Sequence, residues 1–284
     1  MQQPTGQAST TKPLLSLSVD VEDWFMGIEL PVERWDQHEP RLQHGLRRIL
    51  DLLDATGMKA TFFILGAVAE RHPRLIAEIA DKGHEVGSHG WSHAKVYDLT
   101  PAAFEDEITR TDAILQEVTG KKPVGFRAPY FSITAKSLWA LEILKDHGYL
   151  YDSSIYPGSN WRYGIAGSQP TVYKLDNGLV EFPVSTFALG KRRVGIGGAY
   201  LRILPLAVTE WAIRKRLEKG ELSTVYVHPW EFDPDHPKVK FRGLAMLTHY
   251  FYLTSTLPKV DHIVRNHDLI PMVDLLKAHE WLAA

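Results

Sequence analysis

Short β-like runs alternate along this chain with longer segments of helical periodicity, and this alternation constrains the fold more than any other feature. Seven such runs are predicted to be strands, at residues 14–19, 59–65, 85–88, 124–126, 149–151, 179–184 and 224–227. Apolar residues at helical spacing predict four helices, each closed by a glycine, over residues 42–57, 73–83, 100–120 and 134–148. Strands that alternate with such helices form βαβ units around a parallel sheet. Residues 156–178 and 188–205 break the rhythm, and their content of Gly, aromatic residues and Arg predicts two long functional loops.

The composition excludes several kinds of protein. A length of 284 residues suits a single α/β barrel, and the absence of cysteine excludes disulfides and thiolate metal sites. The formal charge of −2 gives no global basic field for nucleic acid or an anionic membrane. The basic run at 214–216, with Lys219, is interpreted as the solvated face of a helix. No apolar run approaches the ~20 residues that span a bilayer.

Residues 1–13 are polar and lack the pattern of a signal peptide. This predicts a disordered leader and a cytoplasmic protein.

Three carboxylates cluster where the first predicted strand ends. Asp20, Glu22 and Asp23 lie within four residues and would repel one another unless a cation or a shifted pKa relieves them. A solvated turn is the alternative interpretation. The apolar neighbours Val21 and Trp24 argue against a fully solvated turn, so we expect a functional role.

Two histidines follow the third predicted strand. His89 and His93 are four residues apart, so on one helical turn they could face the same way and bind a common cation. The spacing alone is weak, because chance and core histidines produce it. Its position at a strand end, where α/β folds place ligands, favours a metal site.

Two further polar side chains end predicted strands. Arg127 follows the apolar run at 124–126 and precedes a proline-aromatic turn, which directs it toward the same edge rather than to the surface. His228 ends the run at 224–227, and histidine is the natural group for proton transfer near neutral pH.

Taken in order, these clusters resemble the motifs of the polysaccharide deacetylase family, also called the NodB-homology or carbohydrate esterase family 4 group. The similarity is closest to the branch associated with exopolysaccharide and exosortase gene clusters. That branch carries D-V-E-D, S-H-G-x-x-H, R-A-P-x-F-S, Y-D-S-S and H-P-W-E, found here at residues 20–23, 88–93, 127–132, 151–154 and 228–231. The resemblance extends from Leu14 to Leu276.

The resemblance implies a fold and a cofactor. The fold would be a distorted (β/α) barrel with fewer than eight complete strands, a single catalytic domain over residues 14–284 with a family-specific part from about residue 157. A divalent cation would lie at its C-terminal mouth, bound by His89 and His93. Zinc is the expectation, and Co²⁺, Ni²⁺ or Mn²⁺ suit the same nitrogen and oxygen ligands. The commoner motif T-F-D-D places base and ligand side by side, but Val21 cannot bind a cation. The carboxylate ligand would therefore be Glu22, with Asp23 as the alternative.

The resemblance also implies chemical roles for the remaining motif residues. Asp20 would be the catalytic base, Arg127 its orienting partner and His228 the general acid. Asp152 would help to position the catalytic histidine, and the Tyr130 backbone N–H would hold the oxyanion. Trp91 and Trp230 would stack on sugar faces, with core packing as the alternative.

The implied function is a metal-dependent N-deacetylase of an amino-sugar-containing polysaccharide or its precursor. Its partner would be a carbohydrate, with no nucleic acid and no membrane span. One alternative keeps the chemistry and changes the substrate, as an amide or formamide hydrolase acting on a small molecule or a lipid-linked sugar. Another is a non-catalytic carbohydrate-binding protein of the same fold. The joint presence of Asp20, His89, His93, Arg127 and His228 argues against the non-catalytic alternative.

Overall fold

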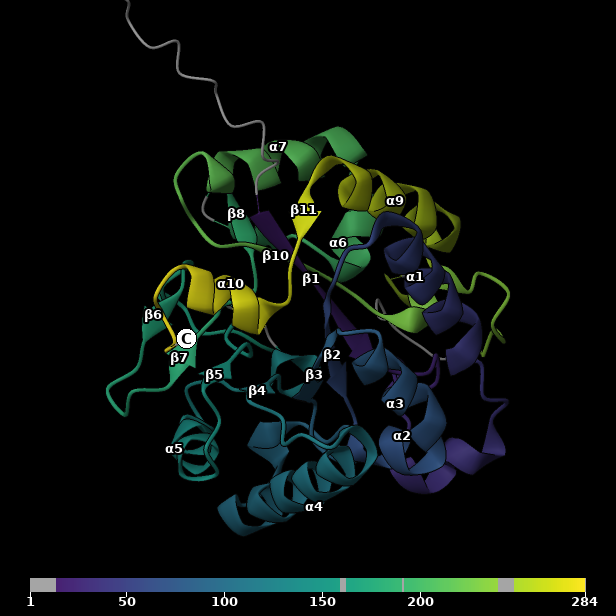
Figure 1. Cartoon of the computed structure of the whole chain (residues 1–284), viewed down its shortest axis with the longest axis vertical. Coiled ribbons are helices and arrows are strands. Elements are labelled where there is room, and N and C mark those ends of the chain that lie inside the picture. The colour runs from purple at the N-terminus through teal and green to yellow at the C-terminus, as the bar shows by residue number, and fades with distance from the viewer. Residues whose placement is uncertain (1–13, 159–161, 191, 240–247, 284) are drawn as a thin grey trace, which may run out of the picture.

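A curved, mostly parallel sheet forms the centre of the protein. The computed structural model describes residues 14–158, 162–190, 192–239 and 248–283. In these residues the strand order is β10-β1-β2-β3-β4-β5-β7-β6, and β11 pairs with β1 outside this path. The strands are β1 (Leu14–Val21), β2 (Thr61–Ile64), β3 (Glu85–Ser88), β4 (Gly125–Phe126), β5 (Tyr151–Asp152), β6 (Tyr173–Lys174), β7 (Val180–Glu181), β10 (Thr224–Val227) and β11 (Asp268–Leu269). Only β6 runs antiparallel to its neighbour in this sheet. The strands follow an arc (Figure 1), which confirms the predicted distorted (β/α) barrel.

Strand β1 is second in the sheet, between β10 and β2, and is buried along nearly its whole length. It pairs in parallel with β2 and with β10, so that Val19 lies beside both Phe62 and Val227. Because parallel strands end at the same edge, the residues after Val19 and after Val227 meet there. This register brings the first and the last predicted motifs together.

Helices and short 3-10 turns cover the sheet. The longer helices are α1 (Leu42–Thr56), α3 (Pro73–Asp81), α4 (Pro101–Thr119), α5 (Trp139–Asp146), α7 (Leu206–Leu217), α9 (Thr256–Asn266) and α10 (Met272–Ala278). The shorter ones include α2 (Gly66–Arg71), α6 (Gly198–Ile203), η3 (Pro129–Phe131) and η4 (Pro229–Phe232). Figure 1 shows α7 and α9 at the top of the molecule and α4 and α5 at the bottom. Of the described helices, none has the length and apolarity to cross a membrane.

Several sequence-based predictions of local structure were wrong. The helix predicted from Thr134 begins only at Trp139, after a turn in which Ser137 Oγ accepts a hydrogen bond from the Thr134 N–H. Residues 188–205 are not one loop, because they include the end of β8 (Thr186–Leu189), β9 (Arg192–Gly195) and α6. The described parts of the segment 156–178, residues 156–158 and 162–178, are mostly irregular as predicted, apart from β6 and an isolated bridge. Arg216 is buried and not part of a solvated face. Residues 1–13, the predicted leader, lie outside the described residues.

Gly45 permits the close approach of α1 to η4, the turn that follows His228. A Cβ at Gly45 would lie 1.8 Å from the Pro229 carbonyl oxygen, so the two segments would have to separate. We expect Gly45→Ala to lower the free energy of unfolding by about 1–3 kcal/mol despite the better helix propensity of alanine. Urea unfolding measures this, with Gln43→Ala on the exposed face of the same helix as control. Equal stability of the two variants would show that η4 moves freely away from α1.

Candidate active site

The carboxyl ends of four strands converge on one cavity. Asp20 and Glu22 come from the end of β1, His89 from β3, Arg127 from β4 and His228 from β10. Asp20, Glu22 and His228 line the cavity directly, together with aromatic side chains from neighbouring loops, and its volume is about 170 Å³. The structure therefore brings together residues spread over more than 200 positions of sequence.

Arg127 is buried and holds Asp20 in place. Its Nη1 donates to Asp20 Oδ1 at 2.8 Å and to Ser18 Oγ at 2.8 Å. Two further nitrogens of the same guanidinium donate to Ser153. Nη2 donates to the Ser153 Oγ at 2.9 Å, and Nε donates to the Ser153 carbonyl oxygen at 3.2 Å. With its guanidinium fixed by three residues, Arg127 can hold the Asp20 carboxylate in one orientation, with Oδ2 directed toward His228 at 3.9 Å.

His228 is held by a second buried ion pair. Its Nδ1 lies 3.1 Å from Glu231 Oε2, and its backbone N–H donates to the same oxygen at 2.9 Å. Glu231 in turn accepts from Arg202 Nε at 2.7 Å. Burial alone would raise the pKa of Glu231, but Arg202 and His228 lower it, so Glu231 is ionised. An ionised Glu231 accepts the Nδ1–H of His228 and leaves Nε2 directed toward Asp20 and the cavity.

The charges around His228 favour its protonated form. Burial alone would lower the pKa of His228, but the carboxylates of Glu22, Glu231 and Asp20 outweigh burial and raise it to about 9. A histidine of this kind enters a reaction near neutral pH as an acid.

Glu22, His89 and His93 form a cluster with the donor set of a divalent cation. Glu22 Oε1 lies 2.9 Å from His93 Nε2 and 3.3 Å from His89 Nε2, and all three residues are buried. Burial alone would raise the pKa of Glu22, but His93 and His228 lower it well below its usual value. One carboxylate and two imidazoles are ligands that Zn²⁺ and its neighbours accept.

The tautomer of His89 gives an independent test of this fit. Its Nδ1 lies 2.7 Å from the Arg127 carbonyl oxygen, which can only accept, so Nδ1 carries the hydrogen. In the neutral ring, Nε2 then directs its lone pair at the Glu22 carboxylate. Two electron-pair donors facing one another in a buried site need a proton or a cation between them. Metal-bound imidazoles usually donate their other ring N–H to a carbonyl or a carboxylate, and the Arg127 carbonyl accepts from His89 in this way. The residues therefore fit a bound metal.

The spacing of the two histidines predicted that one helical turn would bring them together. They do meet, but not through a helical turn. Residues after β3 form an irregular turn, with Gly90 at φ 76° and His93 at φ 62°. Glu107 of α4 holds this turn by accepting from the Trp91 and Ser92 N–H groups at 2.6 and 2.9 Å. The left-handed residues reverse the chain and return His93 to His89.

Asp23 lies outside this cluster. Its Oδ2 accepts from the N–H groups of Arg41 and Leu42 at 2.8 and 3.0 Å, and its Oδ1 from that of Trp24 at 2.8 Å. Asp23 thereby caps the first turn of α1, where an anion is favoured. Of the two carboxylates that the sequence left open, Glu22 is the one placed beside the histidines.

Asp152 does not contact His228, and the positioning role implied for it falls to Glu231. The Asp152 side chain accepts from Ser154 Oγ and Ser154 N, and lies behind Arg127 beside Glu181. Burial and the neighbouring Asp152 charge raise the pKa of Glu181 well above its usual value. Glu181 Oε2 accepts no hydrogen bond in the described structure, which agrees with a carboxyl group whose ionised form is disfavoured.

The aromatic residues predicted to bind substrate separate into two groups. Trp230 lines the cavity and stacks on His228 and on His249, with ring centroids 5.3 and 4.2 Å apart. Trp91 does not line it. The Trp91 ring packs beneath Arg110 at 3.8 Å and against Gly66, where a Cβ would lie 2.3 Å from it. The core-packing alternative is therefore the correct interpretation of Trp91.

Tyr130 lies on the wall of the cavity in an unusual backbone conformation. Tyr130 and Phe131 have consecutive positive φ values of 58° and 52°, which are uncommon for residues other than glycine. The Tyr130 hydroxyl donates to the Met26 carbonyl, and its ring lies 4.4 Å from that of His93. Its N–H donates to no other residue that the structure describes. The implied oxyanion role requires an N–H without an acceptor in the protein, and this N–H meets that condition among the described residues.

Sequence reasoning missed two positioning residues, Glu231 and Arg202. Glu231 belongs to the H-P-W-E motif, and its spacing of three residues from His228 is the signal of a capping box, which the structure contains. Arg202 had no signal, since it reaches Glu231 from α6, a segment predicted to be a loop.

We expect Glu22→Gln to weaken metal binding by more than ~100-fold, because even residues behind metal ligands contribute 10–100-fold. Asp23→Asn is the matched control. It should cost about 1 kcal/mol of stability through the cap and leave metal affinity unchanged. Calorimetric titration of the metal-free protein with Zn²⁺ measures both. If Asp23→Asn abolishes binding and Glu22→Gln does not, the assignment is reversed. Stoichiometric metal retained by a His89→Ala/His93→Ala variant would exclude the site altogether.

Comparison with known proteins gives the same fold. A polysaccharide deacetylase from Mycobacterium smegmatis, provisionally described as such, superimposes with a TM-score of 0.64 and 20% identity, over 98% of this chain and 93% of that one. This likeness concerns the fold alone. The curled sheet with its covering helices is the distorted (β/α) barrel of the NodB-homology type.

Sequence comparison identifies the family. Residues 35–151 match the polysaccharide deacetylase profile, and residues 153–277 match a second profile described as a domain of unknown function. A peptidoglycan deacetylase-like protein of Gibberella zeae is 32% identical over 52% of this chain and 39% of its own length. A peptidoglycan-N-acetylglucosamine deacetylase of Bacillus cereus is 38% identical over 34% of this chain and 35% of its own length. The chain thus spans less than half of these two relatives. Its segment 35–151 belongs to the polysaccharide deacetylase family.

Proposed function

We propose that this protein is a metal-dependent hydrolase that removes N-acetyl groups from an amino-sugar polysaccharide or its precursor. The observation that carries the proposal is the convergence, at one cavity, of a fixed carboxylate, a protonated histidine and a metal-type donor cluster. The relatives named as peptidoglycan deacetylases support the class of substrate.

The three groups divide the work of amide hydrolysis. Glu22, His89 and His93 would hold the cation, with zinc as the proposed metal. When bound, the cation supplies Lewis-acid activation of the acetamide carbonyl. Asp20, held by Arg127, takes a proton from the attacking water, and its free Oδ2 faces the cavity for this purpose.

The leaving amine requires an acid, because an amide anion does not leave. His228 carries a proton on Nε2, and Glu231 keeps the ring in the orientation that presents it. The Tyr130 N–H is available to donate to the developing oxyanion. Trp230 and the buried walls limit access of bulk water, which strengthens each of these interactions.

Acetate release from a panel of N-acetylated glycans tests the proposal. The panel contains oligomers of N-acetylglucosamine, peptidoglycan fragments and N-acetylated exopolysaccharide, with zinc-loaded and metal-stripped protein in parallel. We expect the zinc-loaded protein to release acetate from at least one polymer, and the metal-stripped protein to release none. Because the sequence motifs resemble the branch associated with exopolysaccharide gene clusters, we propose exopolysaccharide as the substrate within this panel.

Two outcomes would overturn the proposal. Hydrolysis confined to small amides or formamides would make the protein an amidase with another substrate. Binding of glycans without acetate release by the metal-loaded protein would leave a carbohydrate-binding protein.

A further inference from the structure

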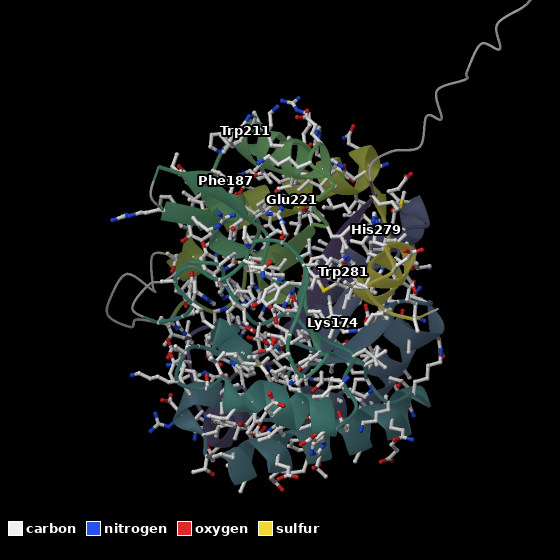
Figure 2. All side chains as sticks on the ribbon, turned by 90° about the vertical axis from the view of Figure 1, so that its left-hand side faces the viewer. Lys174, Phe187, Trp211, Glu221, His279 and Trp281 are labelled. Carbon is white, nitrogen blue, oxygen red and sulfur yellow. The ribbon has the colours of Figure 1, made fainter. Side chains whose placement is uncertain are left out.

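A second concave surface lies between the β8–β9 hairpin and α7. This groove has a volume of about 310 Å³ and shares no lining residue with the cavity around Asp20 and His228. Figure 2 shows Phe187, from the hairpin, and Trp211, from α7, together at this end of the molecule with Glu221.

The groove has an aromatic wall that solvent can reach. Trp211 is 42% exposed, and its ring meets Phe187 edge to face, with centroids 5.8 Å apart and an interplanar angle of 90°. This contact fixes the orientation of the indole and leaves part of its surface accessible. An exposed, oriented indole is well suited to stack on the apolar face of a pyranose ring.

The groove is also strongly cationic in a chain with a formal charge of −2. Four cations line it, Arg193, Lys215, Arg216 and Lys219, against one carboxylate, Glu221, which gives 4 − 1 = +3. This local excess opposes the overall charge and would attract an anion.

The single carboxylate of the groove pairs with one of its two guanidiniums, that of Arg216. Arg216 lies 3.1 Å from Glu221 and also donates to Ser223 Oγ and to three carbonyl oxygens. Arg193 donates to Thr186 Oγ1 at 2.8 Å. Burial lowers the pKa of both guanidinium groups, and the charge of Arg193 lowers that of Arg216 further. An anionic ligand would relieve this repulsion.

We propose that the groove between the β8–β9 hairpin and α7 binds a segment of an acidic polysaccharide, with a sugar ring against Trp211 and its carboxylate at Arg193 and Lys219. The aromatic wall selects a sugar, and the net positive charge selects a carboxylate-bearing one. The choice of a polysaccharide rests on the proposed function, because the groove would then hold the same kind of polymer as the catalytic cavity. Leu189 is 64% exposed at the end of β8 and would also suit a bilayer surface. The concave shape favours a polymer chain instead.

Calorimetric titration of the full chain with a galacturonate hexamer tests the proposal. We expect binding that weakens with salt, and weaker binding of a neutral N-acetylglucosamine oligomer. Trp211→Ala should weaken binding of the acidic hexamer at least about tenfold, as buried aromatic anchors typically do. Trp281→Ala is the matched control, since Trp281 is exposed in another region of the surface. Lys219→Ala should also weaken binding, and Lys174→Ala should not.

The outcomes separate this proposal from the catalytic one. Acetate release from a short soluble substrate should be unchanged in Trp211→Ala, because the groove and the cavity share no residue. If the wild-type protein releases no acetate but binds the hexamer through Trp211, the catalytic proposal fails and this one stands. No binding of the hexamer, or equal binding of the neutral oligomer, would overturn it. So would Trp211-dependent binding to phosphatidylglycerol vesicles without hexamer binding, which would assign the groove to a membrane surface.

Discussion

Asp20→Asn is expected to lower turnover by about 10²–10⁴-fold while bound metal remains stoichiometric, because removal of a general base costs about that much. The amide oxygen of asparagine can still accept from Arg127, so the position of the side chain is largely kept. What is lost is the ability to take a proton from water. Steady-state acetate release and metal analysis on the same preparation measure the two effects.

The buried contact with Arg127 calls for a control of folding in this variant. Loss of the Asp20 charge leaves a buried guanidinium without its counter-ion, which destabilises proteins by about 3–5 kcal/mol. Thermal unfolding must therefore show that Asp20→Asn is folded at the assay temperature. Asp36→Asn, an exposed carboxylate, serves as the unaffected control. A folded, metal-loaded Asp20→Asn protein with turnover within tenfold of wild type would mean that Asp20 is not the base.

His228→Ala is expected to remove the alkaline limb of the pH–rate profile and to cut turnover by about 10²-fold or more. The reacting form of His228 is protonated, so activity should fall as pH rises through its pKa. That pKa is raised to about 9 from 6.5 by carboxylates that include Glu22. A cation at Glu22 offsets part of this attraction, so the wild-type limb should lie between these two values. The loss should be smaller on a matched O-acetyl substrate, since an alkoxide leaves with less assistance than an amine.

Two neighbours distinguish a positioning effect on His228 from general damage. Glu231→Gln should shift the alkaline limb to lower pH, because Glu231 raises the pKa of His228 through its contact with Nδ1. Asp152→Asn should leave the limb in place, since Asp152 contacts Ser154 and not His228. Exposed His262 provides the control His262→Ala. Equal losses on N-acetyl and O-acetyl substrates would make His228 a binding residue.

The strand ends could be predicted from sequence because their signals are local. Short β-like runs predict β1, β3 and β10, and parallel strands must end at one edge, so Asp20, His89 and His228 were expected to lie near one another. The predicted run at 85–88 and that at 224–227 agree with the observed strands residue for residue.

The choices that the sequence left open depended on partners from distant elements. The choice between Glu22 and Asp23 depends on where α1 begins, because the N–H groups of Arg41 and Leu42 hold Asp23 away from the histidines. The choice between sugar stacking and core packing for Trp91 depends on Arg110, on α4, which covers its ring. The His89–His93 turn could have been predicted better, since Gly90 permits the left-handed conformation that breaks a helix there.

The pairing of β1 with β10 and β11 has a consequence for how the protein is made. Leu17 pairs with Val225, a residue synthesised about 200 positions later, and Leu15 pairs with Leu269. Until β10 and β11 leave the ribosome, β1 has an open edge, and the turn that carries Asp20 and Glu22 has no neighbour on that side. Contacts this distant in sequence slow folding and expose strand edges to aggregation. The segment matched by the deacetylase profile, residues 35–151, contains neither β1 nor β10, so it cannot assemble these catalytic groups by itself.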